Sequence, residues 1–418
     1  MNFIDSGRRR RRRINMRLKR GRRIRSAFRF GASNLAPILK IAGLVAAAAG
    51  LVLLVIFVIV PLFDGGSKPE PTPTPTVAPT PTPSPTPIAK PDMSDGAEEL
   101  PINYNSINDP YVYGREVVFS TGAPGESAPT LDRIAIYNLD TKTTEEVAEI
   151  KLANANLFEP RINEKYIVYL DCKNENGGSV CAYNRETREA FVMREYLYGK
   201  PKVSLVGNLA LWMQQTGGGT DKLYLYNLDT RETTVIEELV DPNSIRFSPS
   251  AAYMSEDAII FVEPKDETKV PANSSASTEA ELRIIPLKEG GDRQSVLFLP
   301  GPDTYVYDPM IEGDNIVFLN GPRDLASNLM LCARTGDTYS QPVLIAEGVL
   351  NYCMGDGFVA YTSKDSTIMI YYFKDGSTGR LSKDGTKGIL ASANGKDVVW
   401  YDVTDIESAS VIIHLQVP

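Results

Sequence analysis

Three acidic residues stand at the same place in a short repeated motif and are the first candidates for chemistry. Asp109, Glu159 and Asp308 each precede a proline. Carboxylates gathered around one rim could hold Ca²⁺ or a cationic ligand, because such hard cations take oxygen ligands. Lys200 and Ser248 occupy this place in two other copies of the motif, however, and Asp-Pro pairs also start turns. Two interpretations therefore stay open, a rim of carboxylates and local turn chemistry.

The cysteines and the single histidine further limit the kinds of site that the chain can form. Cys172 and Cys181 flank a short loop, and in a hairpin symmetric about Asn176-Gly177 they would lie directly opposite, within disulfide range. The alternative is a pair of buried thiols. The four cysteines form no CxxC pair, and one histidine, His414, excludes multi-histidine metal sites. We expect His414 to be a packed strand residue, and we expect no metal, no cofactor and no catalytic residue.

A recurring pattern along residues 98–418 must position these groups. Three copies of a motif that opens with an acid-proline pair align without gaps, and four looser copies follow the same pattern. The seven copies end at Phe119, Tyr169, Trp212, Phe261, Phe318, Tyr361 and Trp400. They recur about every 47 residues, and each is followed by an alternating segment such as Ile134–Thr141. We therefore predict an all-β fold, a β-propeller of about seven four-stranded blades, with six and eight blades also open.

The two ends of this repeated region indicate how the ring closes. The last unit stops after its third alternating segment, at Pro418. The segment Leu100–Tyr104 precedes the first unit and has no partner there. We predict that it supplies the outermost strand of the last blade, which would remove an exposed sheet edge.

One unit carries a resemblance to a known family. The segment Leu223–Ile236 reads LYLYNLDTRETTVI, and strands such as Tyr166–Leu170 read YIVYL. Together they resemble the TolB-type, WD40-like propellers of bacterial envelopes. The resemblance covers about 320 residues and implies the propeller fold. This chain departs from TolB itself in its N-terminal part, so the resemblance does not imply the same partners.

The N-terminal part divides the charge of the chain. Residues 1–40 hold 14 Lys and Arg and one acid, so they carry +13, and the other 378 residues carry −21 of the total −8. The basic cluster includes the unbroken run Arg8, Arg9, Arg10, Arg11, Arg12 and Arg13. The 23 residues 41–63 contain no charge and are long enough for one membrane-spanning helix. The positive-inside rule places residues 1–40 in the cytoplasm, where the arginines would contact anionic lipid. Nucleic-acid binding by this tail is not expected.

A Pro/Thr-rich linker is predicted to follow the span. Ten of the 29 prolines lie within residues 69–91, mostly in Thr-Pro repeats. Such a run favours an extended polyproline II chain of roughly 70 Å. We therefore divide the chain into a basic cytoplasmic tail (1–40), a transmembrane helix (41–63), an extended linker (64–97) and an extracytoplasmic β-propeller (98–418).

This organisation predicts a single-pass cell-membrane protein that displays a binding or scaffold domain. Its expected partners are an extracellular protein, a glycan or a wall polymer. Neither sialidase Asp-boxes nor a GxSxG domain occurs, so the chain is predicted not to be an enzyme. The alternative is an extracellular carbohydrate-active enzyme that uses the propeller carboxylates. A sensor that signals to the cytoplasmic tail is a third hypothesis.

Overall fold

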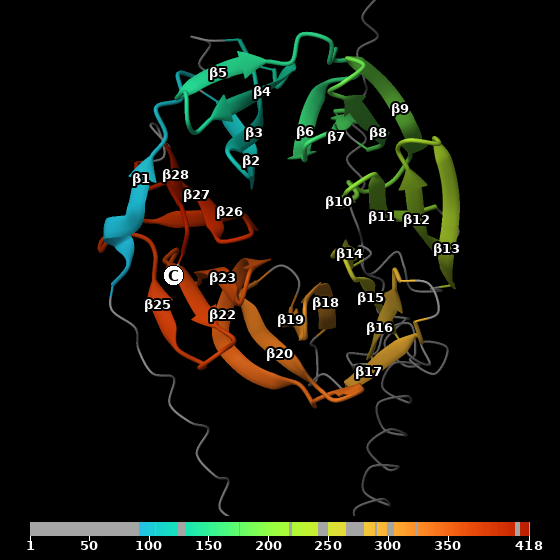
Figure 1. The fold of residues 1–418 in the computed structure, drawn as a ribbon, viewed down its shortest axis with the longest axis vertical. Helices are drawn as coiled ribbons and strands as arrows, with labels where there is room; N and C mark the ends of the chain where they lie inside the picture. Colours follow the sequence, from blue (N-terminus) through green and yellow to red (C-terminus); the bar gives the residue numbers. More distant parts are fainter. Residues whose placement is uncertain are drawn as a thin grey trace, which may run out of the picture. The chain divides into compact units, whose positions relative to one another are not determined.

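The described part of the chain folds into a ring of antiparallel sheets (Figure 1). The computed structural model describes residues 92–418, except 105, 124–129, 175, 217–219, 241–249, 265–279, 289–290, 299–304, 323–324, 406–409 and 418. Apart from one 3-10 turn at Ser94–Gly96, the elements assigned in this part are strands. The predicted all-β propeller fold is confirmed.

Five separate sheets of the described part have four strands each. The first contains β2 (Ile107–Tyr113), β3 (Glu116–Thr121), β4 (Arg133–Asn138) and β5 (Thr143–Glu146). The second contains β6 (Asn156–Ile162), β7 (Tyr166–Cys172), β8 (Gly178–Asn184) and β9 (Glu189–Tyr196). The third contains β10 (Val203–Val206), β11 (Leu209–Gln215), β12 (Thr220–Asn227) and β13 (Glu232–Val240). The fourth contains β14 (Tyr253–Met254), β15 (Ala258–Pro264), β16 (Ala280–Pro286) and β17 (Gln294–Phe298). The last contains β26 (Gly388–Asn394), β27 (Asp397–Asp402), β28 (Ser410–His414) and β1 (Ala97–Glu99).

One larger sheet occupies the rest of the ring. Its strands are β18 (Tyr305–Glu312), β19 (Asn315–Gly321), β20 (Ser327–Thr335), β21 (Thr338–Tyr339), β22 (Val343–Gly355), β23 (Phe358–Ser363), β24 (Ile368–Tyr372) and β25 (Thr378–Arg380). The first half of β22 pairs with β20 and its second half pairs with β23. The prediction of about seven separate four-stranded blades is therefore wrong: five are separate, and the larger sheet contains one unbroken strand, β22, that pairs with both β20 and β23.

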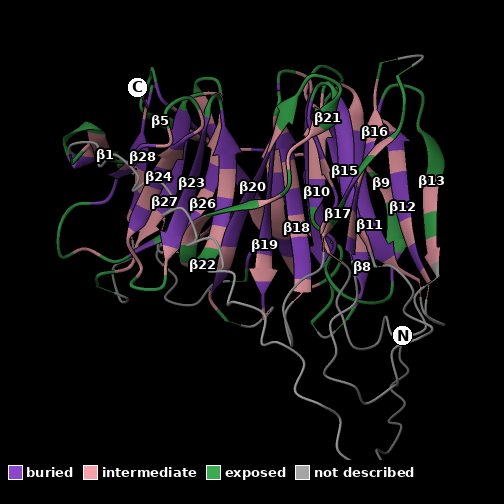
Figure 2. Ribbon diagram, turned by 90° about the horizontal axis from the view of Figure 1, so that it is seen from below, coloured by how far each residue is buried: buried purple, intermediate pink, exposed green. Residues whose placement is uncertain are grey.

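The hydrophobic core lies between neighbouring sheets, because both faces of each sheet are covered. Every residue of β7 is buried, and the second strands of the other sheets are almost as fully covered (Figure 2). Tyr166 from the second sheet and Trp212 from the third belong to one such interlayer cluster. Burial of each large apolar side chain contributes about 1.5–3 kcal/mol. This packing explains why the predicted second strands read as nearly continuous apolar runs.

A segment that precedes the first sheet closes the ring, as predicted from the sequence, although its residues differ from those expected. β1 pairs with β28, with Ala97 opposite His414. The closing strand spans residues 97–99 rather than 100–104, so the prediction was placed three residues too late. Leu100 extends the contact, since its N–H donates to the carbonyl of Val411 at 2.9 Å.

The predicted N-terminal elements lie outside the described residues. They are the arginine run Arg8–Arg13, the span 41–63 and most of the linker. Among the residues that are described, no helix has the length and apolar character needed to cross a bilayer.

Candidate functional site

The acid-proline motif builds a bulge in three of the innermost strands. Asp109, Glu159 and Asp308 have positive φ angles of 50°, 49° and 48°. The strand register shifts at each of these positions, in β2, β6 and β18. An acidic side chain at such a bulge is turned away from the regular ladder and becomes free to contact a neighbouring sheet. The three predicted acids therefore have the same backbone conformation, and each forms the bulge of its strand.

Two of these carboxylates accept backbone N–H groups from other sheets. Asp109 Oδ2 accepts from the N–H of Glu159 at 2.9 Å, and Asp308 Oδ1 accepts from the N–H of Ala251 at 2.9 Å. The backbone N–H of Asp308 in turn donates to Ser250 Oγ at 2.7 Å. These bonds tie the first sheet to the second and the fourth to the larger sheet, so the acids align the inner edges of the ring.

A lysine pairs with one carboxylate oxygen of Glu159, and another lysine pairs with one of Asp308. Lys200 Nζ lies 3.2 Å from Glu159 Oε1, and Lys202 Nζ donates to Asp308 Oδ2 at 2.8 Å. Within the described residues no group of three or more Asp, Glu, Cys or His is placed to hold a metal ion. At Glu159 and Asp308 an ammonium group thus stands where the Ca²⁺ hypothesis would put the metal.

Solvent reaches the inside of the ring at this level. The side chain of Lys202 is 59% exposed although it directly precedes the innermost strand β10 and reaches Asp308 two sheets away. Partial burial opposes the charge of Lys202, but the Asp308 carboxylate beside it raises its pKa overall. We call the solvent-accessible space enclosed by β2, β6, β10, β14, β18, β22 and β26 the central channel.

An arginine and two tyrosines lie close together further along the channel, two residues beyond the acids in β2 and β6. The guanidinium of Arg161 lies 4.9 Å from the ring centre of Tyr111, a distance typical of a cation–π contact. Arg161 also influences the pKa values of Tyr253 and Cys353, which come from β14 and β22. Asn394 donates to the hydroxyl of Tyr111 at 3.4 Å. We call Arg161, Tyr111, Tyr253 and Cys353 the arginine cluster.

The channel end formed by the short turns after the innermost strands is acidic. Partial burial, together with the nearby charges of Asp356, Glu256 and Asp257, raises the pKa of Glu312 to about 7. At the same end Tyr113 donates to Glu164 Oε1 at 2.6 Å. The two ends therefore differ, because acids gather here, whereas Lys200 and Lys202 offset the charges of Glu159 and Asp308 on the other side of the arginine cluster.

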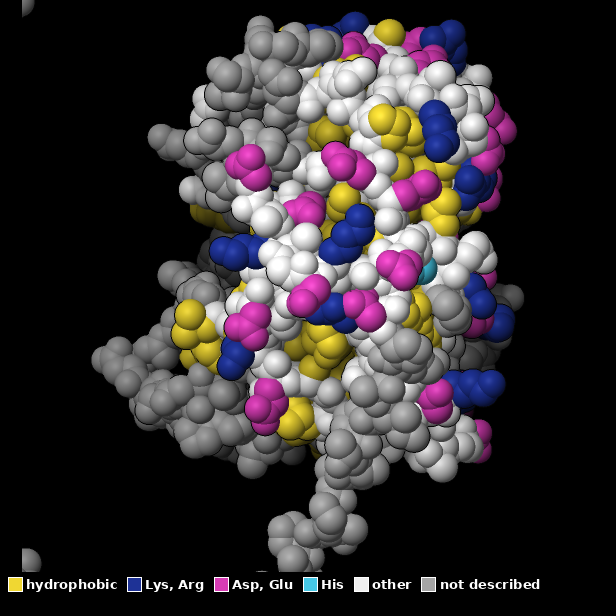
Figure 3. Space-filling view, turned by 90° about the vertical axis from the view of Figure 1, so that its left-hand side faces the viewer, with side chains coloured by type: hydrophobic (Ala, Val, Ile, Leu, Met, Phe, Trp, Pro, Cys, Tyr) yellow, Lys and Arg dark blue, Asp and Glu magenta, His cyan; other side chains and the backbone are white. Residues whose placement is uncertain are grey.

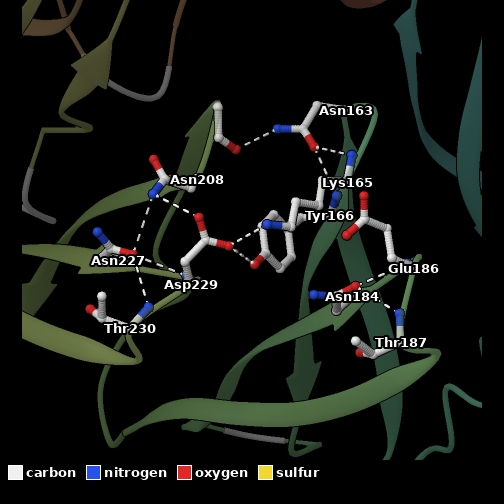
Figure 4. A network of polar contacts seen from close by, with 11 residues as sticks. Asn163, Lys165, Tyr166, Asn184, Glu186, Thr187, Asn208, Asn227, Asp229 and Thr230 are labelled. Carbon is white, nitrogen blue, oxygen red and sulfur yellow. Dashed lines mark hydrogen bonds and ion pairs between the residues drawn. The ribbon is translucent and has the colours of Figure 1, made fainter.

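The repeated Tyr-Asn-x-Asp/Glu-Thr segments form hairpin turns. In one of them Asn227 Oδ1 accepts the N–H groups of Asp229 and Thr230 at 3.0 and 3.1 Å (Figure 4). Asp229 then reaches the second sheet, where it accepts from Lys165 Nζ at 2.5 Å and from the Tyr166 hydroxyl at 2.6 Å. This network (Figure 4) fastens two sheets together and has a structural role.

The proposed Cys172–Cys181 disulfide is absent, and all four cysteines of the chain, which are all described, are free. The register of the hairpin places Cys172 opposite Gly178 and Cys181 opposite Tyr169. The two thiols therefore lie three positions apart along the ladder and enter two different core clusters. The symmetric hairpin assumed from the sequence was wrong.

His414 is a packed residue of the closure, as predicted. It is only 5% exposed, and its Nε2 lies 3.2 Å from the carbonyl oxygen of Met93. On the outer side of the ring near this closure, acidic, basic and apolar side chains are interspersed (Figure 3). That face therefore shows no charge concentration comparable to the channel.

Sequence reasoning missed Arg161, Lys202 and Glu312. A signal for the first two exists, because each lies two residues after the acid position of its motif copy, on the same side of an otherwise apolar strand. Glu312 gave no such signal, since its neighbours Asp356 and Glu256 come from distant turns.

Comparison with known proteins supports the fold and changes one prediction. No protein-family model matches the sequence, and no curated protein matches it. The propeller domain of the Trilobed protease from Pyrococcus furiosus is similar in structure, with a TM-score of 0.54 and 18% identity over 74% of this chain and 93% of that one. Prolyl endopeptidases are similar at a TM-score of 0.53 and 12% identity, over 76% of this chain, which spans 47% of theirs. An oligogalacturonate lyase from Vibrio parahaemolyticus is similar at 0.50 and 12% identity, over 76% of this chain and 92% of that one.

These similarities show the fold, and TolB from Acinetobacter baumannii is among the matching propellers, at a TM-score of 0.39. The similar structures correct the prediction that the chain is not an enzyme. The similar structures come from a protease, from prolyl endopeptidases and from a lyase. The missing catalytic motifs therefore do not separate this chain from enzymes that are built on the same fold.

Proposed function

We propose that the chain is a membrane-anchored binding protein whose propeller takes a ligand into the central channel. The observation that carries this proposal is the exposed, charged interior of the ring, where Lys202 is 59% exposed next to the arginine cluster. A channel that served packing alone would be filled by apolar side chains. The ligand belongs to the extracellular proteins, glycans or wall polymers expected from the sequence.

We also infer seven radial units for the ring. The larger sheet would count as two units that share β22, because that strand is the outer strand of one and the inner strand of the next. Around the ring each innermost strand lies beside the next, from β2 through β6, β10, β14, β18 and β22 to β26, which lies beside β2.

Photo-crosslinking tests binding in the channel. A benzoylphenylalanine replacing Tyr253 keeps an aromatic ring in the channel, and the same group replacing Val235, which is 45% exposed on the outer strand β13, is the matched control. We expect a crosslinked partner from position 253 that is absent at position 235. Crosslinks from position 235 alone would move the binding surface to the outside of the ring.

The membrane anchor is supported by the uncharged residues 41–63 and the basic residues 1–40. Protease treatment of intact cells that carry a tag at each end of the chain tests the topology. We expect loss of the C-terminal tag and protection of the N-terminal tag, with a cytoplasmic protein as the intactness control. Protection of both tags contradicts an extracytoplasmic propeller.

A carbohydrate-active enzyme is the second candidate. It is favoured by the channel acids Asp109 and Glu159, since paired carboxylates can act as acid and base on glycosidic bonds. The similarity to an oligogalacturonate lyase over 92% of that chain points the same way. Assay of the full-length protein against a glycan panel tests it. Turnover that Glu159→Gln abolishes, but that the surface change Asp337→Asn does not, would establish the enzyme.

A further inference from the structure

Arg161 is a cation of the channel that no carboxylate of the described residues contacts within ion-pairing distance. Lys200 and Lys202 are each paired with an acid, at 3.2 and 2.8 Å. The hydrogen bond of Arg161 runs from Nη1 to the carbonyl oxygen of Pro160, its own neighbour in the chain, at 3.0 Å. Among the described residues, its other contact is the ring of Tyr111. A guanidinium has five N–H donors, so most of them remain available to a ligand.

The surroundings of Arg161 are built from several sheets. Tyr111 comes from β2, Tyr253 from β14 and Cys353 from β22, and each is only partly exposed. Burial raises the pKa of the Cys353 thiol, while the charges of Arg161 and Lys202 act in the opposite direction. The guanidinium therefore acts on groups from across the ring, in a space that solvent reaches but that is drier than the outer surface. Charge-assisted hydrogen bonds are strengthened in such a space.

The charges along the channel disfavour entry of an anion from one end. Beyond the arginine cluster, burial together with the charges of Asp356, Glu256 and Asp257 raises the pKa of Glu312 to about 7. An anionic ligand is repelled from that end, whereas at the other end Lys200 and Lys202 offset the charges of Glu159 and Asp308.

We propose that Arg161 is the binding site for a carboxylate group of the channel ligand, a proposal that rests on the function proposed above. The planar guanidinium fork matches a carboxylate in two parallel hydrogen bonds. A phosphate fits less well, because Lys200 and Lys202 are already neutralised and the nearby Asp109 would repel a second negative charge. Tyr111 holds the guanidinium from one face and leaves its edge for the ligand.

Alkylation of Cys353 provides a probe of this site. Iodoacetate carries a carboxylate and iodoacetamide is its neutral analogue. In both reactions the thiolate sulfur forms a bond to the CH₂ carbon, iodide leaves, and the thiol proton passes to water. Cys353 is also the one partly exposed thiol, since the other three are buried. Peptide mass spectrometry of the full-length protein therefore reports the two rates at Cys353.

We expect the iodoacetate-to-iodoacetamide rate ratio at Cys353, relative to glutathione, to be raised about tenfold in the native protein. Arg161→Gln should return the ratio to that of glutathione, and Arg161→Lys should leave part of the increase. Arg115→Gln is the matched control, because Arg115 already forms an exposed ion pair with Asp140. A ratio that is unchanged in Arg161→Gln, or a Cys353 that neither reagent labels, overturns the proposal. Circular dichroism checks that each variant is folded. If Arg161→Gln does not fold, the comparison of Arg161→Lys with the native protein still tests the proposal.

Protection of Cys353 from iodoacetamide distinguishes the sources of the carboxylate. Glucuronate against glucose tests a sugar acid, and an acetylated tripeptide acid against its amide tests a peptide C-terminus. Protection by a charged member of either pair and not by its neutral partner supports the site and names its source. Equal effects of charged and neutral members overturn it. If crosslinking from position 253 finds no partner while the Arg161-dependent rate ratio persists, the binding function fails and the carboxylate site stands.

Discussion

The closure of the ring makes a quantitative prediction at Gly96, where the N-terminal segment crosses β28. A Cβ added to Gly96 would lie 2.3 Å from Nε2 and 2.7 Å from Cε1 of His414. The His414 ring has little room to retreat, because it is 5% exposed and lies within hydrogen-bonding distance of the Met93 carbonyl. Gly96→Ala should therefore push β1 away from β28.

The loss of stability expected for Gly96→Ala follows from the size of this clash. Overpacking of this kind costs about 1–3 kcal/mol. For a folded unit of this length, about 1 kcal/mol shifts the melting temperature by roughly 1.5–2 °C, so we expect a decrease of about 2–6 °C. His414→Ala removes a buried ring and should cost about 2–4 kcal/mol on its own. In the double variant the clash disappears, so its cost should be smaller than the sum of the single costs by about 1–3 kcal/mol.

Thermal unfolding followed by circular dichroism measures this cycle. Glu98→Ala is the control on the same strand, since Glu98 is exposed and its loss should change stability by less than about 0.5 kcal/mol. A Gly96→Ala protein that melts with the native one, or a double variant whose costs are additive, would refute the argument that His414 and Gly96 lock the closure.

Three further predictions follow from the described contacts. Glu312 has its pKa raised from 4.5 to about 7, so the folded state binds a proton more tightly than the unfolded one and this contribution to stability is lost as the pH rises from about 4.5 to 7. Glu312→Gln should therefore increase the free energy of unfolding by about 1–3 kcal/mol more at pH 8 than at pH 4.5 in urea titrations, and an equal change at both pH values contradicts the raised pKa of Glu312. Unfolding without reductant should expose four reactive thiols by Ellman titration, whereas two would show that Cys172 and Cys181 are bonded after all. Asn227→Ala should cost about 1 kcal/mol in the same urea titration, because it removes the acceptor of two turn N–H groups, and no loss would mean that the turn forms without its side chain.

The acid-proline motif shows how far sequence reasoning could reach in the candidate site. Its repetition identified Asp109, Glu159 and Asp308 as equivalent, and they occupy equivalent bulges. The partners of these acids could not be predicted from the sequence. Lys202 and Asp308, for example, lie 106 residues apart and come into contact only because the sheets between them are packed side by side in the ring. Arg161 was missed for the same reason: an arginine becomes a candidate only when its neighbours across the ring are known.

The sequence by itself determined the strands, their turns and the ring. These features depend on local periodicity and on hydrogen bonds within a few residues, such as that from Asn227 Oδ1 to the following N–H groups. Only the tertiary structure decided the register that keeps Cys172 and Cys181 apart, the unbroken run of β22 and the charges that face the channel. Each of these depends on packing between residues distant in the chain, where a shift of one position changes which side chains meet.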